Sequence, residues 1–209
     1  MIVVTGGAGF IGSCIIAQLN AIGWKEIIVV DEALGDDPKK RNLEQKHYKE
    51  SIEKGDFLKL VRDNKVHPKI ESVIHMGACS STTGTDVKYY EENNFLYTKT
   101  LAEWCLKNNI RFIYASSAAT YGDGHLGYKD DEQTTRQLQP LNIYGASKQK
   151  FDLWALDQKV LDKMVGLKFF NVFGPNEYHK GDMRSVMAKA FQRVHDDGKM
   201  SLFKSYHPD

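Results

Sequence analysis

The chain carries a glycine-rich turn close to its N-terminus, Thr5-Gly6-Gly7-Ala8-Gly9-Phe10-Ile11-Gly12. A short run rich in β-branched residues, 1–4, precedes the turn, and an apolar pattern at helical spacing, 15–22, follows it. A strand, a glycine turn and a helix in this order are the fingerprint of a dinucleotide-binding unit. In such a unit Gly6 permits the tight turn, Gly9 lets the backbone approach a pyrophosphate, and Gly12 lets the helix pack on the strand.

An acidic residue follows this turn at the spacing expected for ribose binding. The run 26–30 predicts a second strand that ends in Asp31. A carboxylate about 20 residues past the glycines is placed to hold a ribose hydroxyl of a bound dinucleotide. The turn and Asp31 together predict a nucleotide-binding site.

The rest of the chain alternates strands with helices, which indicates an α/β fold built on a parallel sheet. Further strands are expected at 71–75, 111–114 and 165–170, and helices at 56–62 and 88–107. The polar stretches 36–50 and 122–139 are expected to be loops over the cofactor adenosine and over a substrate. Pro140 is expected to open the helix that contains Tyr144.

These elements predict a Rossmann-type, doubly wound parallel sheet with helices on both faces. We expect an NAD(P)-binding domain at residues 1–170. Residues 171–209 are expected to form the start of an incomplete, smaller substrate-binding domain.

A tyrosine and a lysine stand four residues apart in Tyr144-Gly145-Ala146-Ser147-Lys148. Four residues are about one helical turn, so a helix places both side chains on one face. A free phenol titrates near pH ~10 and a free lysine near ~10.4, so neither alone is a useful base at neutral pH. An ammonium beside the phenol is expected to lower the tyrosine pKa toward neutral pH. Alone the spacing is common in amphipathic helices, and its meaning comes from the accompanying motifs.

Two serines follow the strand expected at 111–114, in Ser116-Ser117-Ala118-Ala119-Thr120-Tyr121. With the glycine turn before them and Tyr144 and Lys148 after them, the chain resembles the extended short-chain dehydrogenase/reductase superfamily. The resemblance implies that Ser117 orients the substrate oxygen, Tyr144 moves its proton, and Lys148 holds the nicotinamide ribose. Ser117 is preferred to Ser116 because the serine of the family stands directly before the Ala-x-x-Tyr stretch.

Three stretches, 77–83, 115–122 and 170–181, narrow the resemblance within the superfamily. Together they are similar to the isomerases that epimerise an ADP-activated heptose at C6 with tightly bound NADP, for the lipopolysaccharide inner core. The most specific feature is His179-Lys180-Gly181, which implies Lys180 as a second acid/base beside Tyr144. Because hydride must return to the opposite face, the oxygen changes position, and a second acid/base serves that position. Other sugar-nucleotide epimerases, 4,6-dehydratases and non-catalytic dinucleotide-binding proteins remain alternatives.

The resemblance also assigns binding residues. Cofactor contacts are expected at Gly6, Gly9, Phe10, Ile11, Gly12, Asp31, Glu32, Lys39, Lys54, Met76, Gly77, Ala78, Cys79, Ser80, Asn93 and Lys148. Substrate contacts are expected at Ser117, Asn171, Val172, Asp182, Lys189 and Phe203. The length of the loop 32–41 leaves open whether Lys39 or Lys40 fills its position. The resemblance implies NADP, which that lysine can support by pairing the 2′-phosphate. NAD is the alternative because Asp31 ordinarily repels a 2′-phosphate.

Composition excludes several other classes of function. A net charge of +1 and a pI of about 7.7 give no support for nucleic acid or an anionic membrane as partner. No apolar run reaches about 18 residues and Met1 begins a strand, so neither a membrane span nor a signal peptide is expected. Widely spaced cysteines indicate reduced thiols in a cytoplasmic protein. His75 and Cys79 are the only metal-ligand types at close spacing, so no metal is expected.

The C-terminal end predicts a fragment. Chains of the superfamily continue well past the equivalent of Asp209, where they carry the rest of the substrate domain. We therefore expect a truncated chain, with a nucleotide-sugar substrate and a homo-oligomeric state for the full-length protein.

Overall fold

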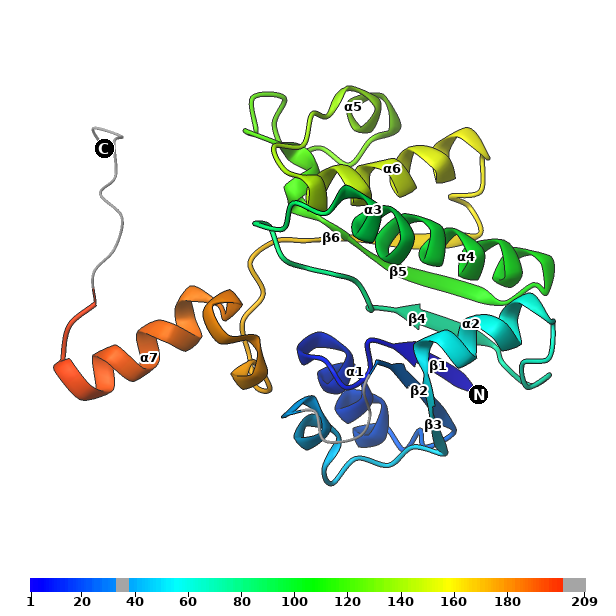
Figure 1. Ribbon diagram of the computed structural model, residues 1–209, viewed down its shortest axis with the longest axis horizontal. Helices are drawn as coiled ribbons and strands as arrows, with labels where there is room; N and C mark the ends of the chain where they lie inside the picture. The colour runs from blue at the N-terminus through cyan, green and yellow to red at the C-terminus, as the bar shows by residue number, and fades with distance from the viewer. Residues whose placement is uncertain (33–37, 201–209) are drawn as a thin grey trace.

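The structure, a computed structural model, describes residues 1–32 and 38–200. Its centre is one parallel sheet of six strands in the order β3-β2-β1-β4-β5-β6, with helices on both sides (Figure 1). From β1 the chain first builds outward to β3 and then returns to β4 on the other side. This arrangement confirms the predicted α/β class and the doubly wound Rossmann-type sheet.

Side chains along each strand point alternately to the two faces of the sheet. Their bounds are β1 Ile2–Thr5, β2 Ile27–Asp31, β3 Glu50–Glu53, β4 Ser72–His75, β5 Arg111–Ser117 and β6 Met164–Phe169. Within β1, Val3 and Val4 belong to different hydrophobic clusters, as the period of two along a strand requires. Strand β2 is buried along its whole length because helices cover both of its faces.

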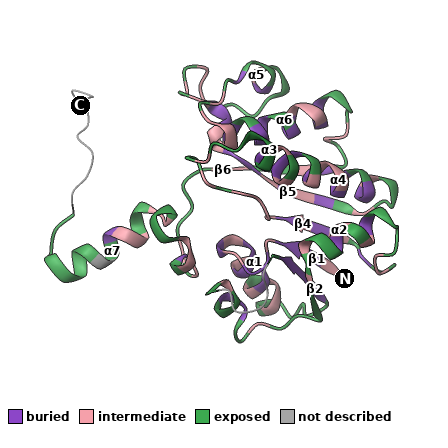
Figure 2. Cartoon of the chain, in the orientation of Figure 1, coloured by how far each residue is buried: buried purple, intermediate pink, exposed green. Residues whose placement is uncertain are grey.

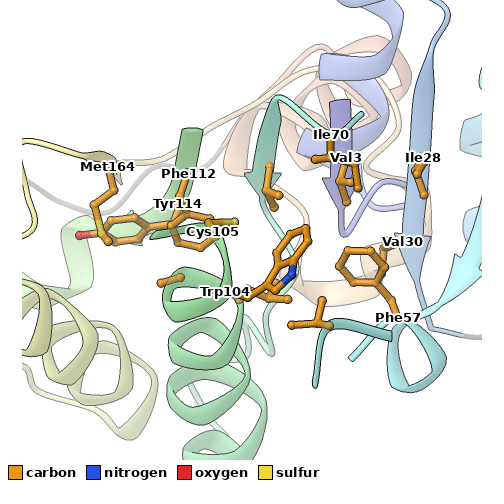
Figure 3. Packing of buried hydrophobic residues seen from close by; sticks show 14 of the residues in the cluster. Val3, Ile28, Val30, Phe57, Ile70, Trp104, Cys105, Phe112, Tyr114 and Met164 are labelled. Carbon is orange, nitrogen blue, oxygen red and sulfur yellow. The ribbon is translucent and has the colours of Figure 1, made fainter. Parts of the chain in front are cut away.

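The larger hydrophobic cluster lies between the sheet and α2 (Lys54–Arg62), α4 (Tyr97–Lys107) and α6 (Ile143–Asp157). Figure 3 shows Trp104 and Phe57 in this layer, packed edge to face with ring centroids 6.5 Å apart. The smaller cluster includes Ile16 of α1 (Phe10–Ala21) and Leu43 of η1 (Pro38–Leu43), a 3₁₀ helix. Packing from both sides fixes the carboxyl edge of the sheet, where the predicted site lies.

The helix predicted at 88–107 is wrong as one uninterrupted α-helix. The segment consists of α3 (Val87–Tyr90), a π-helical turn η2 (Glu91–Leu96) and α4. The π turn contains Asn94, whose amide accepts from the Cys79 N–H at 2.8 Å and donates to the Cys79 carbonyl at 3.0 Å. The irregular turn therefore anchors the loop that follows β4.

Three other boundaries differ from the prediction. Pro140 does not open α6, because Asn142 is the N-cap and its side chain accepts from the Gly145 N–H at 2.7 Å. The predicted loop 122–139 contains α5 (Glu132–Gln137), and the predicted loop 36–50, described from residue 38, contains η1 and reaches β3. Strand β3 was not predicted because Ile52 is its single apolar residue, and one apolar residue cannot show the alternation that marks a strand.

A short 3₁₀ element η3 (Ala118–Tyr121) follows β5. After β6 the described chain adds no strand to the sheet and forms η4 (Tyr178–Met183) and α7 (Val186–Asp197). Helix α7 extends away from the sheet, and Figure 2 shows that most of its residues are exposed. The domain boundary near residue 170 stays a prediction. Within residues 1–32 and 38–200, no helix has the length and apolar character to cross a membrane.

Candidate active site

A cleft of about 470 Å³ opens at the carboxyl edge of the sheet. Its walls come from the glycine turn, the ends of β2 and β5, the loop after β4, helix α6 and the segment 179–183. Most predicted cofactor and catalytic residues line it, namely Gly6, Gly9, Phe10, Ile11, Gly12, Asp31, Glu32, Lys39, Lys54, Met76, Gly77, Ala78, Cys79, Ser80, Asn93, Tyr144, Lys148 and Lys180. The fold brings these residues together from distant parts of the sequence, and their binding roles stay predictions.

The glycine turn forms a cradle that has no room for side chains. Gly6 has a φ of +65°, and a Cβ at this position would lie 2.6 Å from the Gly77 nitrogen. A Cβ at Gly12 would lie 2.1 Å from the Gly6 carbonyl oxygen. Helix α1 begins after Gly9 without a side-chain cap, and its first residues line the cleft, so its uncapped N-terminus is available to an anion there. This geometry fits the pyrophosphate of a dinucleotide.

Asp31 at the end of β2 is a buried carboxylate whose charge a neighbouring lysine offsets. Buried Asp31 accepts from the Ala8 N–H at 2.9 Å, and Lys39 Nζ lies 3.1 Å from its other oxygen. Lys54 pairs with Glu32 at 2.7 Å and donates to Asn93 at 3.1 Å. Of the two lysines left open by the sequence, Lys39 lines the cleft, whereas Lys40 is exposed.

Tyr144 and Ser117 meet beside the end of β5. Burial raises the pKa of Tyr144, while a hydrogen bond with the Ser117 hydroxyl acts in the opposite direction. Lys148 Nζ lies 6.0 Å from the centre of the Tyr144 ring. The expectation that the lysine brings the tyrosine pKa toward neutrality was wrong for this arrangement, because burial dominates. Tyr144 is therefore a protonated phenol at neutral pH.

The two serines at the end of β5 face different partners, and the choice of Ser117 over Ser116 stays a prediction. Ser116 contributes to the cleft wall, but its hydroxyl donates to Asp152 at 2.7 Å, behind the site. Ser117 is not a lining residue, yet its side chain bonds to Tyr144. Its hydroxyl oxygen also accepts from the Ala119 N–H at 3.1 Å, which fixes its orientation at the end of β5.

Lys180 reaches the cleft from η4, and its Nζ lies 5.6 Å from the centre of the Phe10 ring. Buried Glu177 shapes this segment, since its carboxylate accepts from Gly174 N–H at 2.9 Å and Ser185 N–H at 2.6 Å. Asn42 joins the segment to the glycine turn by donating to the Ala8 carbonyl at 2.9 Å.

The same Asn42 amide reaches the Asn176 carbonyl at 3.3 Å and a ring nitrogen of His179 at 3.2 Å. These contacts hold the Lys180 segment against the glycine turn. Neither Asn42 nor Glu177 was singled out from the sequence. Asn42 contacts residues far along the chain, Glu177 accepts hydrogen bonds within an irregular turn, and neither kind of contact follows a periodic pattern.

The described residues that were predicted to bind substrate are not brought together in the cleft. Asn171, Asp182 and Lys189 do not line the cleft, and Lys189 donates to the Asp182 carbonyl. Val172 lines a separate apolar groove beside α1. Phe203 lies outside the described residues. Residues 1–32 and 38–200 contain no cluster of three or more His, Cys, Asp or Glu side chains suited to a metal ion.

Comparison with known proteins agrees with this geometry. The model of the NAD dependent epimerase/dehydratase family matches residues 2–208. An ADP-L-glycero-D-manno-heptose-6-epimerase of Nitratidesulfovibrio vulgaris (strain DP4) is 50% identical over 209 residues, 100% of this chain and 64% of the relative. The chain thus spans slightly less than two thirds of that relative's length.

Two solved structures show the same architecture. The crystal structure of Helicobacter pylori ADP-L-glycero-D-manno-heptose-6-epimerase superposes with a TM-score of 0.79 at 26% identity, covering 95% of this chain and 64% of that one. A UDP-N-acetylglucosamine 4-epimerase from Methanobrevibacter ruminantium superposes with a TM-score of 0.74 at 28% identity, covering 93% of this chain and 62% of that one.

Proposed function

Because the chain belongs to the NAD dependent epimerase/dehydratase family, we propose that it forms the cofactor-binding part and the catalytic centre of an ADP-heptose 6-epimerase. The reaction converts ADP-D-glycero-D-manno-heptose to the L-glycero epimer by oxidation and re-reduction at C6. Residues 1–170 form the dinucleotide domain, and residues 171–209 begin the substrate domain. Support comes from the 50% identity to the Nitratidesulfovibrio vulgaris protein.

The observation that carries the proposal is the presence of Tyr144 and Lys180 in one cleft. The bound dinucleotide supplies the acceptor and donor of hydride. Epimerisation needs proton transfer at the C6 oxygen in two different positions, once for each face of the carbon. One acid/base serves one position well, and a second group at another wall of the cleft serves the other.

Tyr144 suits the first of these positions. Its raised pKa keeps the phenol protonated, so it donates a proton to the oxygen that becomes a hydroxyl on re-reduction. Ser117 holds that oxygen and the phenol in line. Lys180 takes the second position, where it accepts the hydroxyl proton as C6 is oxidised, and it comes from a segment that Glu177 shapes and Asn42 joins to the glycine turn.

We propose NADP as the cofactor, with NAD as the alternative. Asp31 alone would repel a 2′-phosphate, but Lys39 lies 3.1 Å from its carboxylate and offsets its charge. A lysine in this place also offers a direct partner to the phosphate. The glycine cradle fits either dinucleotide equally well.

Three other functions are alternative outcomes of the test. A 4,6-dehydratase of this superfamily is expected to carry an acidic residue beside the serine, and Ala118 stands there. A 4-epimerase shares the turn, Ser117, Tyr144 and Lys148, and would act on a UDP-sugar. A non-catalytic dinucleotide-binding protein would turn over neither substrate.

Carbon-13 NMR of ADP-D-glycero-D-manno-heptose tests the proposal. The assay uses the 209-residue chain and a fusion that adds the remaining part of the Nitratidesulfovibrio vulgaris relative. We expect the fusion to produce the 6-epimer without net consumption of cofactor, and the chain alone to bind NADP without turnover. Turnover of UDP-glucose with no heptose epimerisation would replace the proposal with a 4-epimerase.

A further inference from the structure

A buried carboxylate lies behind the catalytic lysine. Asp152 stands four residues after Lys148 on α6, so the two side chains share one face of the helix. It is 5% exposed and accepts hydrogen bonds from the Tyr114 hydroxyl at 3.0 Å and the Ser116 hydroxyl at 2.7 Å. Lys168 Nζ on β6 completes the cluster at 2.9 Å from the carboxylate.

Lys148 itself has little direct compensation for its charge. It is 4% exposed, and its Nζ donates to the Ala115 carbonyl at 2.8 Å. No carboxylate of the described residues forms an ion pair with it. A buried ammonium without an opposing charge favours its neutral form.

The other groups that face Lys148 do not provide that charge. His75 of β4 lies between Thr5 and Thr98, and burial together with the Lys148 charge lowers its pKa to about 3, so the ring is neutral. Tyr144 is protonated, and Cys79 lies next to Tyr144.

On the outer side of α6, Lys150 and Glu91 of η2 neutralise each other at 2.6 Å. Lys168 also carries a positive charge, and it pairs with Asp152. Asp152 is therefore the acidic group of the described cluster that favours a charged Lys148.

We propose that Asp152 is a positioning residue that keeps the Lys148 ammonium protonated in the active site. This inference rests on the proposed function, in which a charged Lys148 binds the nicotinamide ribose. Burial lowers the pKa of Lys148 to about 8, and the Asp152 charge acts against that lowering. Without Asp152, burial would act unopposed, and a substantial fraction of Lys148 would be neutral at working pH.

The direct test is an NMR titration of Lys148 in the 209-residue chain labelled with carbon-13 at the lysine ε position. Lys148→Met assigns the signal. Asp152→Asn keeps the shape and removes the charge, and we expect the Lys148 midpoint to fall by roughly one pH unit. An unchanged or higher midpoint would overturn the proposal.

Lys168→Met separates charge from structure, because it breaks the same ion pair but leaves the Asp152 charge in place. We expect its Lys148 midpoint to equal or exceed that of the unaltered chain, and a fall would show that the pair acts structurally. Asp157→Asn, an exposed carboxylate on the same helix paired with Arg136 at 2.7 Å, is the matched control and should not move the midpoint. If Asp152→Asn does not fold, the Lys168→Met result decides.

Binding of NADPH, followed by its fluorescence across pH 6 to 10, separates this inference from the function on which it rests. If Lys148→Met binds NADPH as well as the unaltered chain at every pH, the proposed role of Lys148 fails. If Lys148→Met weakens binding but Asp152→Asn leaves the pH dependence unchanged, only the role of Asp152 fails. We expect binding by Asp152→Asn to weaken at a lower pH than in the unaltered chain.

Discussion

Replacement of Lys148 by methionine should stabilise the fold while it weakens cofactor binding. The pKa of Lys148 falls from its ordinary 10.5 to about 8, mainly through burial. At pH 7 this difference corresponds to about 3 kcal/mol of destabilisation by the buried ammonium. Methionine has a similar length and no charge, but it leaves the Ala115 carbonyl without its donor, which costs about 1 kcal/mol.

The net expectation at pH 7 is a gain of about 2 kcal/mol in the free energy of unfolding. For a protein of this size that gain raises the melting temperature by roughly 4–8 °C. The sign depends on pH, since the penalty is complete below the folded pKa of about 8 and absent above the unfolded value of 10.5. The advantage of Lys148→Met should therefore shrink between pH 8 and 10.5.

Urea unfolding followed by circular dichroism at pH 7 and pH 10 measures this effect. Lys150→Met is the matched control, because Lys150 is a half-exposed lysine on the same helix whose surface ion pair contributes little. A Lys148→Met variant that is less stable than the unaltered chain at pH 7 would show that the buried ammonium does not destabilise the fold. A stability difference that does not change with pH would lead to the same conclusion.

Three further substitutions test the site. Tyr144→Phe in the fusion should lower turnover by roughly 10²–10⁴-fold and leave NADP binding intact, as steady-state kinetics and a binding titration will show. Lys39→Met should weaken NADP binding much more than NAD binding, whereas Lys40→Met should change neither; equal losses for both cofactors would remove Lys39 from the phosphate site. Gly12→Ala places a methyl group 2.1 Å from the Gly6 carbonyl oxygen, so it should abolish detectable NADP binding by calorimetry; normal binding would contradict the cradle.

The parts of the site that could be predicted depend on short-range patterns. Gly6, Gly12 and Asp31 belong to a strand-turn-helix unit whose geometry follows from local backbone sterics. The Tyr144–Lys148 pair depends only on helical spacing. Both patterns lie in the cleft because the carboxyl ends of parallel strands meet at one edge of the sheet.

The parts that could not be predicted depend on tertiary contacts. Asn42 and Glu177 act through partners far along the chain or through an irregular turn, so no periodic pattern marks them. The direction of the Tyr144 pKa shift also required the fold, because burial decides it. Asp152 could have been predicted from the sequence, because it continues the four-residue spacing of Tyr144 and Lys148 by one more helical turn.

In the proposed reaction this site moves a hydride away from and back to one carbon of a nucleotide-activated heptose. The most direct test is to incubate the fusion with ADP-D-glycero-D-manno-heptose that carries deuterium at C6, in ordinary water, and to measure the product by mass spectrometry and NMR. We expect an L-glycero product that retains deuterium at C6. A product that has lost the deuterium to solvent hydrogen would contradict the proposed hydride transfer, because the C6 hydrogen would then have left as a proton.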